Sequence, residues 1–209
     1  MSLKLVQQRN HAMPTPVGQF LAIWQLITSG ALLLVILIAP TYVFARDTND
    51  NILAIPFNDD GYKIKEHAML NITVGQVGIL DNLDGPQRYG LEYRFKSFAG
   101  PYGFRLIPAI GAAGARNGAR FFYSDLRHDF YLNRHWLVIP SFGIGVFKDG
   151  NDLHLGDTAE FRSGLEFAYR FNNGYRAGLA IFHLSNGGIS STNPGTEALV
   201  FSFSIPIDD

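Results

Sequence analysis

A histidine, a serine and a glutamate near the end of the chain have the side chains of a catalytic triad. His183 and Ser185 are separated by one residue, so they would point to the same side of a β-strand. Glu197 follows a segment rich in Gly, Ser and Asn. In such a triad the imidazole takes the serine proton, and the carboxylate holds the imidazole in the right tautomer and stabilises the cation that forms. The residue types therefore predict nucleophilic catalysis.

The two strands that carry these residues must form a hairpin if the triad is to assemble. Alternation of polar and apolar residues predicts strands at 174–185 and 196–207. In an antiparallel pair Glu197 would lie opposite His183 or Ser185, and directly opposed residues are about 5 Å apart at Cβ. All three residues fall on faces that we predict to meet lipid, where polar groups are candidates for function. Polar side chains are also ordinary at the headgroup boundary, so spacing alone leaves a structural role open.

Alternation with a period of two recurs through the rest of the chain and predicts an eight-stranded antiparallel β-barrel. After residue 65 the apolar residues show no sustained helical period, and turn-forming Gly, Asn, Asp and Pro separate the alternating segments. The predicted strands are 67–79, 88–98, 102–113, 119–131, 135–147, 158–171, 174–185 and 196–207.

The apolar faces of these strands are larger and more aromatic than the charged faces. The segment 88–98, for example, places Tyr89 and Leu91 on one side and Glu92 and Arg94 on the other. Outer-membrane barrels point apolar side chains to lipid and polar ones to the lumen, so the sequence predicts an all-β transmembrane barrel. The alternative is a soluble lipocalin-like barrel or a β-sandwich with the aromatic faces inside. An eight-stranded barrel is too narrow for a pore, which disfavours transport.

The N-terminal segment is typical of an export signal. Lys4 and Arg9 precede an apolar run at 20–39, and Ala45 ends a Val-Phe-Ala triplet with the spacing of a signal-peptidase site. The alternative is an uncleaved transmembrane anchor, because residues 10–45 carry no formal charge and about 20 apolar residues suffice to span a bilayer.

Composition limits the function classes further. The chain has 209 residues, 17% of them charged, a formal net charge of -1 and no cysteine. This charge balance lacks the basic excess that nucleic-acid binding needs, and without cysteine there are neither disulfides nor thiolate metal sites. We predict a signal peptide at 1–45, a polar periplasmic lead-in at 46–65 and an outer-membrane barrel at 66–209.

The C-terminal motif resembles that of the PagL-type lipid A 3-O-deacylases. That family carries an H-x-S-N motif on its penultimate strand, then a glycine, a loop asparagine and a glutamate early in the last strand. This chain has His183-Leu184-Ser185-Asn186, then Gly188, Asn193 and Glu197, and it ends with Ile205-Pro206-Ile207 before two aspartates. The resemblance is strong from about residue 135 onward, whereas residues 66–134 agree only in strand count and pattern.

The resemblance implies a role for each residue of the motif. Ser185 would be the nucleophile, His183 the general base and Glu197 its orienting partner. Backbone amides around Asn186 and Gly188 would form the oxyanion hole, and the loop asparagine would shape the loop between the two strands.

The function implied by the resemblance is an outer-membrane esterase that removes the 3-hydroxyacyl chain from the 3 position of lipid A. Its substrate would be lipopolysaccharide of a Gram-negative bacterium, and it would need no metal or cofactor. A non-enzymatic small barrel with a structural or adhesive role is the alternative, and the oligomeric state stays open, a homodimer included. Asp152, His154 and Asp157 could hold a metal, but we favour a solvated outer loop for them.

The mature protein is expected to begin at Arg46 and to fractionate with the outer membrane, because the leader is typical of export and the aromatic faces suit lipid. N-terminal sequencing of the membrane fraction tests this expectation. Retention of residues 1–45 would favour the uncleaved anchor instead.

Overall fold

The computed structural model describes most of the barrel region that the sequence predicts. All described residues belong to the compact unit Tyr42–Asp209. The expected signal peptide at 1–45 and the last two residues lie outside them. Among the residues described, no helix is both long and apolar enough to cross a membrane. The described residues are 52–54, 63–80, 85–99 and 105–207.

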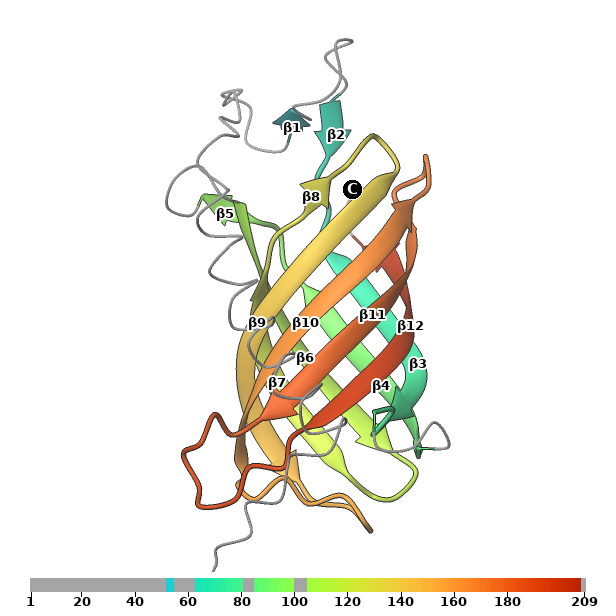
Figure 1. Cartoon of the computed structure of the whole chain (residues 1–209). Helices are drawn as coiled ribbons and strands as arrows, with labels where there is room; N and C mark the ends of the chain where they lie inside the picture. Colours follow the sequence, from blue (N-terminus) through green and yellow to red (C-terminus); the bar gives the residue numbers. More distant parts are fainter. Residues whose placement is uncertain (1–51, 55–62, 81–84, 100–104, 208–209) are drawn as a thin grey trace, which may run out of the picture. The chain divides into compact units, whose positions relative to one another are not determined.

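Eight antiparallel strands close into a barrel (Figure 1). Each strand pairs with the next in sequence, and the last pairs with the first. This arrangement confirms the predicted eight-stranded fold. The barrel strands are β3 (Met69–Val77), β4 (Gln87–Arg94), β6 (Arg105–Ala115), β7 (Arg120–Arg127), β9 (Trp136–Lys148), β10 (Ala159–Arg170), β11 (Arg176–Ser185) and β12 (Thr196–Pro206).

Four short strands accompany the eight long ones: two form a separate sheet, and two pair with strands of the barrel. In the predicted lead-in, β1 (Ile52–Ala54) pairs with β2 (Lys63–Lys65). The predicted segments 88–98 and 119–131 each end with a short strand of their own, because the chain leaves the regular ladder after β4 and after β7. These are β5 (Phe98–Ala99), which pairs with β6, and β8 (Phe130–Tyr131), which pairs with β9.

The barrel is apolar outside and charged inside. Leu91 and Phe122 are 52% and 62% exposed, whereas Glu92, next to Leu91, is 2% exposed. Alternate side chains of a strand point to opposite faces, so this contrast holds around the wall. The predicted orientation is confirmed, and the alternative of a soluble barrel with inward aromatic faces is wrong. Outward apolar residues over a polar interior are the pattern of a transmembrane barrel.

Ion pairs within and between strands neutralise several of the charges in the interior. Arg94 bonds Glu92 and Glu166 with distances of 2.7 Å each. Arg127 bonds Glu92 and also Asp125, the latter at 3.1 Å. Because unpaired charges are very costly away from water, this mutual pairing is what lets a narrow barrel contain so many of them.

Arg162 joins this network to the aromatic part of the interior. Its guanidinium carbon lies 4.2 Å from the ring centroid of Tyr123 and 3.6 Å from that of Phe182, and it also pairs with Asp125. A guanidinium held over ring faces gains cation–π stabilisation in addition to its ion pair.

Apolar side chains close both ends of the interior. At the end where β12 finishes, Ile64 of β2 packs with Tyr131, Leu137, Ile139 and Ala168. The other end holds a larger apolar cluster, and this is the end at which the hairpin of β11 and β12 turns (Figure 1). Its members include Phe121, Phe147, Leu155, Phe182, Leu184 and Val200.

An aromatic band marks the outer wall at the end away from that hairpin turn. Trp136 stacks on Phe167 with ring centroids 4.8 Å apart, and His135 stacks on Tyr169 at 5.2 Å. Such girdles lie at membrane interfaces, where the rings have one apolar and one wet side. The hairpin turn therefore lies toward the opposite interface.

Replacing Glu92 by glutamine should lower the free energy of unfolding by about 3–5 kcal/mol, because buried arginines then lose their counter-charge. Glu160→Gln is the matched control, since Glu160 is 0% exposed but neither carboxylate oxygen has a hydrogen-bond partner among the described residues. The control should be neutral or stabilising. Guanidinium unfolding in detergent micelles, followed by the fluorescence of Trp136, measures both. Equal losses would contradict this account of the interior.

Candidate active site

His183 and Glu197 lie opposite each other on β11 and β12. The register pairs these two residues, and His183 Nδ1 is 2.9 Å from Glu197 Oε1. The sequence left Glu197 opposite either His183 or Ser185, and the structure selects His183. When Nδ1 carries the proton and donates to the carboxylate, Nε2 is left as the basic nitrogen of the ring.

Glu197 is more covered than strand alternation alone would give. Glu197 and Leu199 are two residues apart, so strand alternation puts both side chains on the outward face. Glu197 is nevertheless only 3% exposed, compared with 45% for Leu199. Its partner His183 is itself only 12% exposed at the side chain. A carboxylate shielded from water interacts more strongly with an adjacent imidazole than an exposed one does.

Ser185 is two residues further along β11 on the same outward face as His183. It is half-buried and lies in register with Phe161 of β10. Within the described part of the chain, its hydroxyl makes no hydrogen bond with His183. Catalytic hydrogen bonds often tighten only in the substrate complex, so this geometry does not argue against the pairing.

A second serine lies beside the histidine, and sequence reasoning missed it. Ser163 of β10 is directly opposite His183, so Ser163, His183 and Glu197 form one row across three strands. Directly opposed residues approach within about 5 Å at Cβ. Only the strand register reveals this neighbour, because twenty residues separate the two in sequence.

Asn186 holds the loop that follows the serine. It is fully buried, and its Nδ2 donates to the carbonyl of Thr192 at 2.7 Å and to that of Leu155 at 3.1 Å. Its backbone N–H donates to Asn193 Oδ1 at 3.0 Å, and its own Oδ1 accepts from Gly188 N at 3.0 Å. Both amides expected to form an oxyanion hole are thus engaged with side-chain oxygens. Either amide would have to exchange that bond for one to an oxyanion.

Gly195 brings the end of this loop close over the histidine ring. Its φ is +68°, a left-handed conformation that favours glycine. A Cβ at this position would lie 3.1 Å from His183 Cε1. The loop can therefore pack on the imidazole because this residue has no side chain.

The polar loop between β9 and β10 has its own internal contacts. His154 Nδ1 is 3.0 Å from Asp149 Oδ2 on the surface. Asp157 accepts from the backbone amides of Thr158 and Ala159. Within the described ranges, no group of three or more histidines and acids is placed to hold a metal ion.

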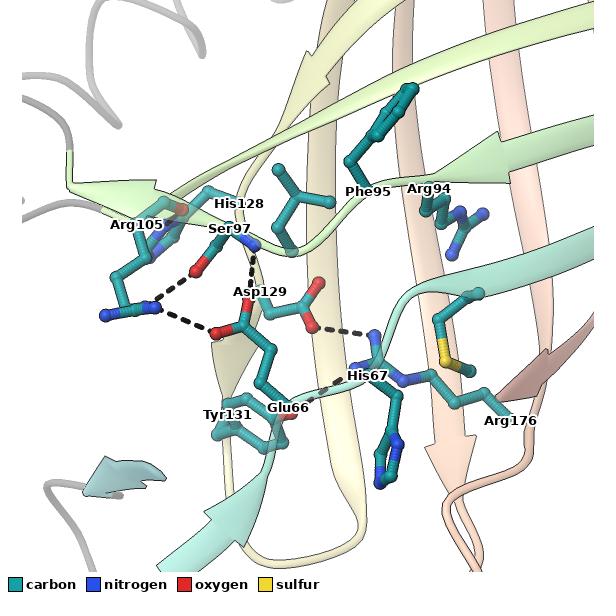
Figure 2. A pocket seen from close by; sticks show the side chains of 12 residues that line it. Glu66, His67, Arg94, Phe95, Ser97, Arg105, His128, Asp129, Tyr131 and Arg176 are labelled. Atoms are coloured by element: carbon teal, nitrogen blue, oxygen red, sulfur yellow. Dashed lines mark hydrogen bonds and ion pairs between the residues drawn. The ribbon is translucent and has the colours of Figure 1, made fainter. Parts of the chain in front are cut away.

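A cavity at the other end of the barrel is lined by paired charges (Figure 2). Glu66 accepts from Arg105 Nη2 at 2.8 Å and from the backbone N–H of Ser97. Arg176 donates to Asp129 at 2.7 Å. The Glu66 contacts fasten the segment before β3 to the barrel, which gives this end a structural role.

His128 and Tyr131 line the same cavity. Burial lowers the pKa of His128, which disfavours a further positive charge in a cavity that Arg105 and Arg176 also line.

Comparison with solved structures finds a similar fold in an outer-membrane enzyme. The chain is similar to the outer membrane enzyme PagL, with a TM-score of 0.54 and 22% identity over 67% of this chain and 100% of that chain. A de novo designed transmembrane β-barrel matches with a TM-score of 0.44 and 12% identity over 70% of this chain and 100% of that one. The Yersinia pestis outer membrane protein Ail matches with a TM-score of 0.38 and 12% identity over 66% of this chain and 99% of that chain. No curated protein matches the chain.

The family match covers more than half of the chain. Residues 87–206 match the family described as Lipid A 3-O-deacylase (PagL). This range holds every barrel strand except β3, together with His183, Ser185 and Glu197. It also begins well before residue 135, where the resemblance in sequence becomes strong. The chain belongs to the PagL lipid A 3-O-deacylase family and, as its barrel also indicates, is a protein of the Gram-negative outer membrane.

Proposed function

We propose that this protein is an esterase that removes the 3-O-linked 3-hydroxyacyl chain of lipid A. In this proposal Ser185 is the nucleophile, His183 the general base and Glu197 the residue that orients His183. The observation that carries the proposal is the hydrogen bond between His183 Nδ1 and Glu197 Oε1, on the face of β11 that also bears Ser185. Family membership supplies the substrate class.

The reaction would proceed through an acyl-enzyme. His183 Nε2 takes the proton of the Ser185 hydroxyl as its oxygen attacks the ester carbonyl, and the same nitrogen then protonates the departing sugar oxygen. Water next attacks the acyl-serine, giving its proton to His183, and the fatty acid leaves with the serine restored. Glu197 stabilises the imidazolium formed in each half of the reaction.

The oxyanion of each tetrahedral intermediate needs nearby hydrogen-bond donors. The amides of Asn186 and Gly188 are the proposed donors, and Asn193 shapes the loop that carries them. Each amide would exchange its side-chain acceptor for the oxyanion, which carries a full negative charge and so forms the stronger bond. Such a donor is typically worth about 3 kcal/mol of the barrier.

The outward position of the site suits a lipid substrate. Leu199, in register with Ile181, is 45% exposed, and Ile189 in the loop between β11 and β12 is 65% exposed. Phe142 of β9 stacks on Phe161, the register partner of Ser185, with ring centroids 6.0 Å apart. An acyl chain in the outer leaflet can approach Ser185 laterally along this apolar wall without entering the barrel. The hairpin turn at the membrane boundary gives water the access that hydrolysis requires.

Ser185→Ala should abolish loss of the 3-hydroxyacyl chain while the barrel still folds, because an outward hydroxyl contributes little to stability. Ser163→Ala is the matched control, since Ser163 is also an outward serine beside His183. It should retain most of the activity. Mass spectrometry of lipid A from cells expressing each variant is the measurement. Activity that survives in the first variant and is lost in the second would make Ser163 the nucleophile.

Glu197→Gln should lower kcat by a large factor, up to about 10⁴ by analogy with the loss of the triad acid in serine proteases. The amide cannot stabilise the imidazolium as the carboxylate does. Glu197→Asp should retain part of the activity if the shorter side chain still reaches His183. Kinetics on purified lipid A in detergent measure both variants, with Glu160→Gln as a control for loss of a buried glutamate. Turnover of Glu197→Gln at the parent rate would remove Glu197 from the mechanism.

A further inference from the structure

A neighbouring loop contacts the segment that carries the proposed oxyanion donors. We call residues 149–158 the β9–β10 loop and residues 186–195 the nucleophile loop. The carbonyl of Leu155 accepts a hydrogen bond from Asn186 Nδ2 at 3.1 Å, and Asn186 directly follows Ser185. Asn186 is 0% exposed, so this bond is shielded from water and is costly to leave unmade.

The two loops also approach each other at a glycine. Gly156 has a φ of +89°, and a Cβ there would lie 2.4 Å from the carbonyl oxygen of Thr192 and 2.6 Å from Thr192 Oγ1. Thr192 is the other residue whose carbonyl accepts from Asn186 Nδ2. A side chain at 156 would therefore push on the backbone that holds the Asn186 amide.

The β9–β10 loop is itself fixed to the rest of the barrel. The Leu155 side chain is 0% exposed and belongs to the apolar cluster that closes this end of the interior. Asn151 N donates to the carbonyl of Asn117 at 2.7 Å, and Asn117 Nδ2 donates back to the carbonyl of Asn151 at 2.9 Å. The loop is thus anchored to the turn between β6 and β7, on the far side from the nucleophile loop.

We propose that the β9–β10 loop positions the nucleophile loop for catalysis, with Leu155 and Gly156 as positioning residues. The inference rests on the proposed function and adds to it a source of rigidity outside the catalytic hairpin. Neither residue needs to touch substrate. Loss of the contact would let Asn186 move, and with it Ser185 and the adjoining amides. Misplacement of a catalytic group by about 1 Å can cost on the order of 100-fold in rate.

Gly156→Ala tests the proposal, with Gly174→Ala as the matched control. Gly174 lies in the turn between β10 and β11, at the other end of the barrel, with a φ of +87°. A Cβ there would meet only ordinary contacts, the nearest at 3.5 Å from Pro206, so the control carries the same backbone strain without pressing on Thr192. In Gly156→Ala we expect kcat for lipid A to fall about 10- to 100-fold with KM changed less than about twofold. The control should keep kcat within about twofold.

A second pair of variants covers the case in which Gly156→Ala does not insert. Asp149 Oδ1 accepts from Leu155 N, whereas Asp157 in the same loop bonds amides that lead into β10. Asp149→Ala should lower kcat several-fold more than Asp157→Ala does, again at unchanged KM. The proposal is wrong if each test variant matches its control in kcat, or if KM alone changes.

Hydrogen exchange separates failure of this inference from failure of the proposed function. Peptides covering the nucleophile loop should exchange at least about tenfold faster in Gly156→Ala than in Gly174→Ala, whatever the enzyme acts on. If the parent protein leaves lipid A intact but the exchange difference is present, the proposed substrate is wrong and the positioning contact stands. If the parent deacylates lipid A and exchange is the same in both variants, the positioning contact is wrong.

Discussion

The need to satisfy every backbone hydrogen bond within the membrane governs this structure. In hydrocarbon an open sheet edge would leave polar groups without partners, so the sheet must close, as it does where β12 pairs with β3. Closure fixes two faces for every strand, one toward lipid and one toward a narrow interior. The apolar outer wall, the paired charges inside and the placement of His183 all follow from that division.

The charged residues inside the barrel fill its interior, and the proposed mechanism does not use them. An eight-stranded barrel encloses just enough space for side chains, and long arginines fill it while pairing with acids on facing strands. Arg162, held between Tyr123 and Phe182, fills space in the same way as an apolar residue would. Arg162 packs on Phe182 of β11, and Glu166 accepts a hydrogen bond from Ser202 of β12. These contacts support the register that pairs His183 with Glu197.

The sequence predicted the strands well because alternation is a local pattern. In each strand apolar and polar residues alternate, so the strand can be recognised from its own segment. The family motif separately identified His183, Ser185 and Glu197 as candidates. The partner of Glu197 stayed ambiguous, since loop geometry decides whether it pairs with position 183 or 185. Ser163, Leu155 and Gly156 could not be found this way, because their importance comes from contacts between distant segments. The occupied amides of Asn186 and Gly188 also depend on a loop conformation that no periodicity records.

The proposed active site lies where two requirements meet. An ester buried among acyl chains is reached most directly from the lipid-facing wall, yet an acyl-enzyme must be hydrolysed by water, which hydrocarbon excludes. At the end of β11 the outward face still continues the apolar wall through Ile181 and Leu179, and one residue beyond Ser185 the chain enters the polar loop. A serine placed deeper on this strand would meet lipid without water, and one placed in the loop would lose the fixed geometry of the sheet. Ser185, the proposed nucleophile, meets both requirements as the last residue of β11.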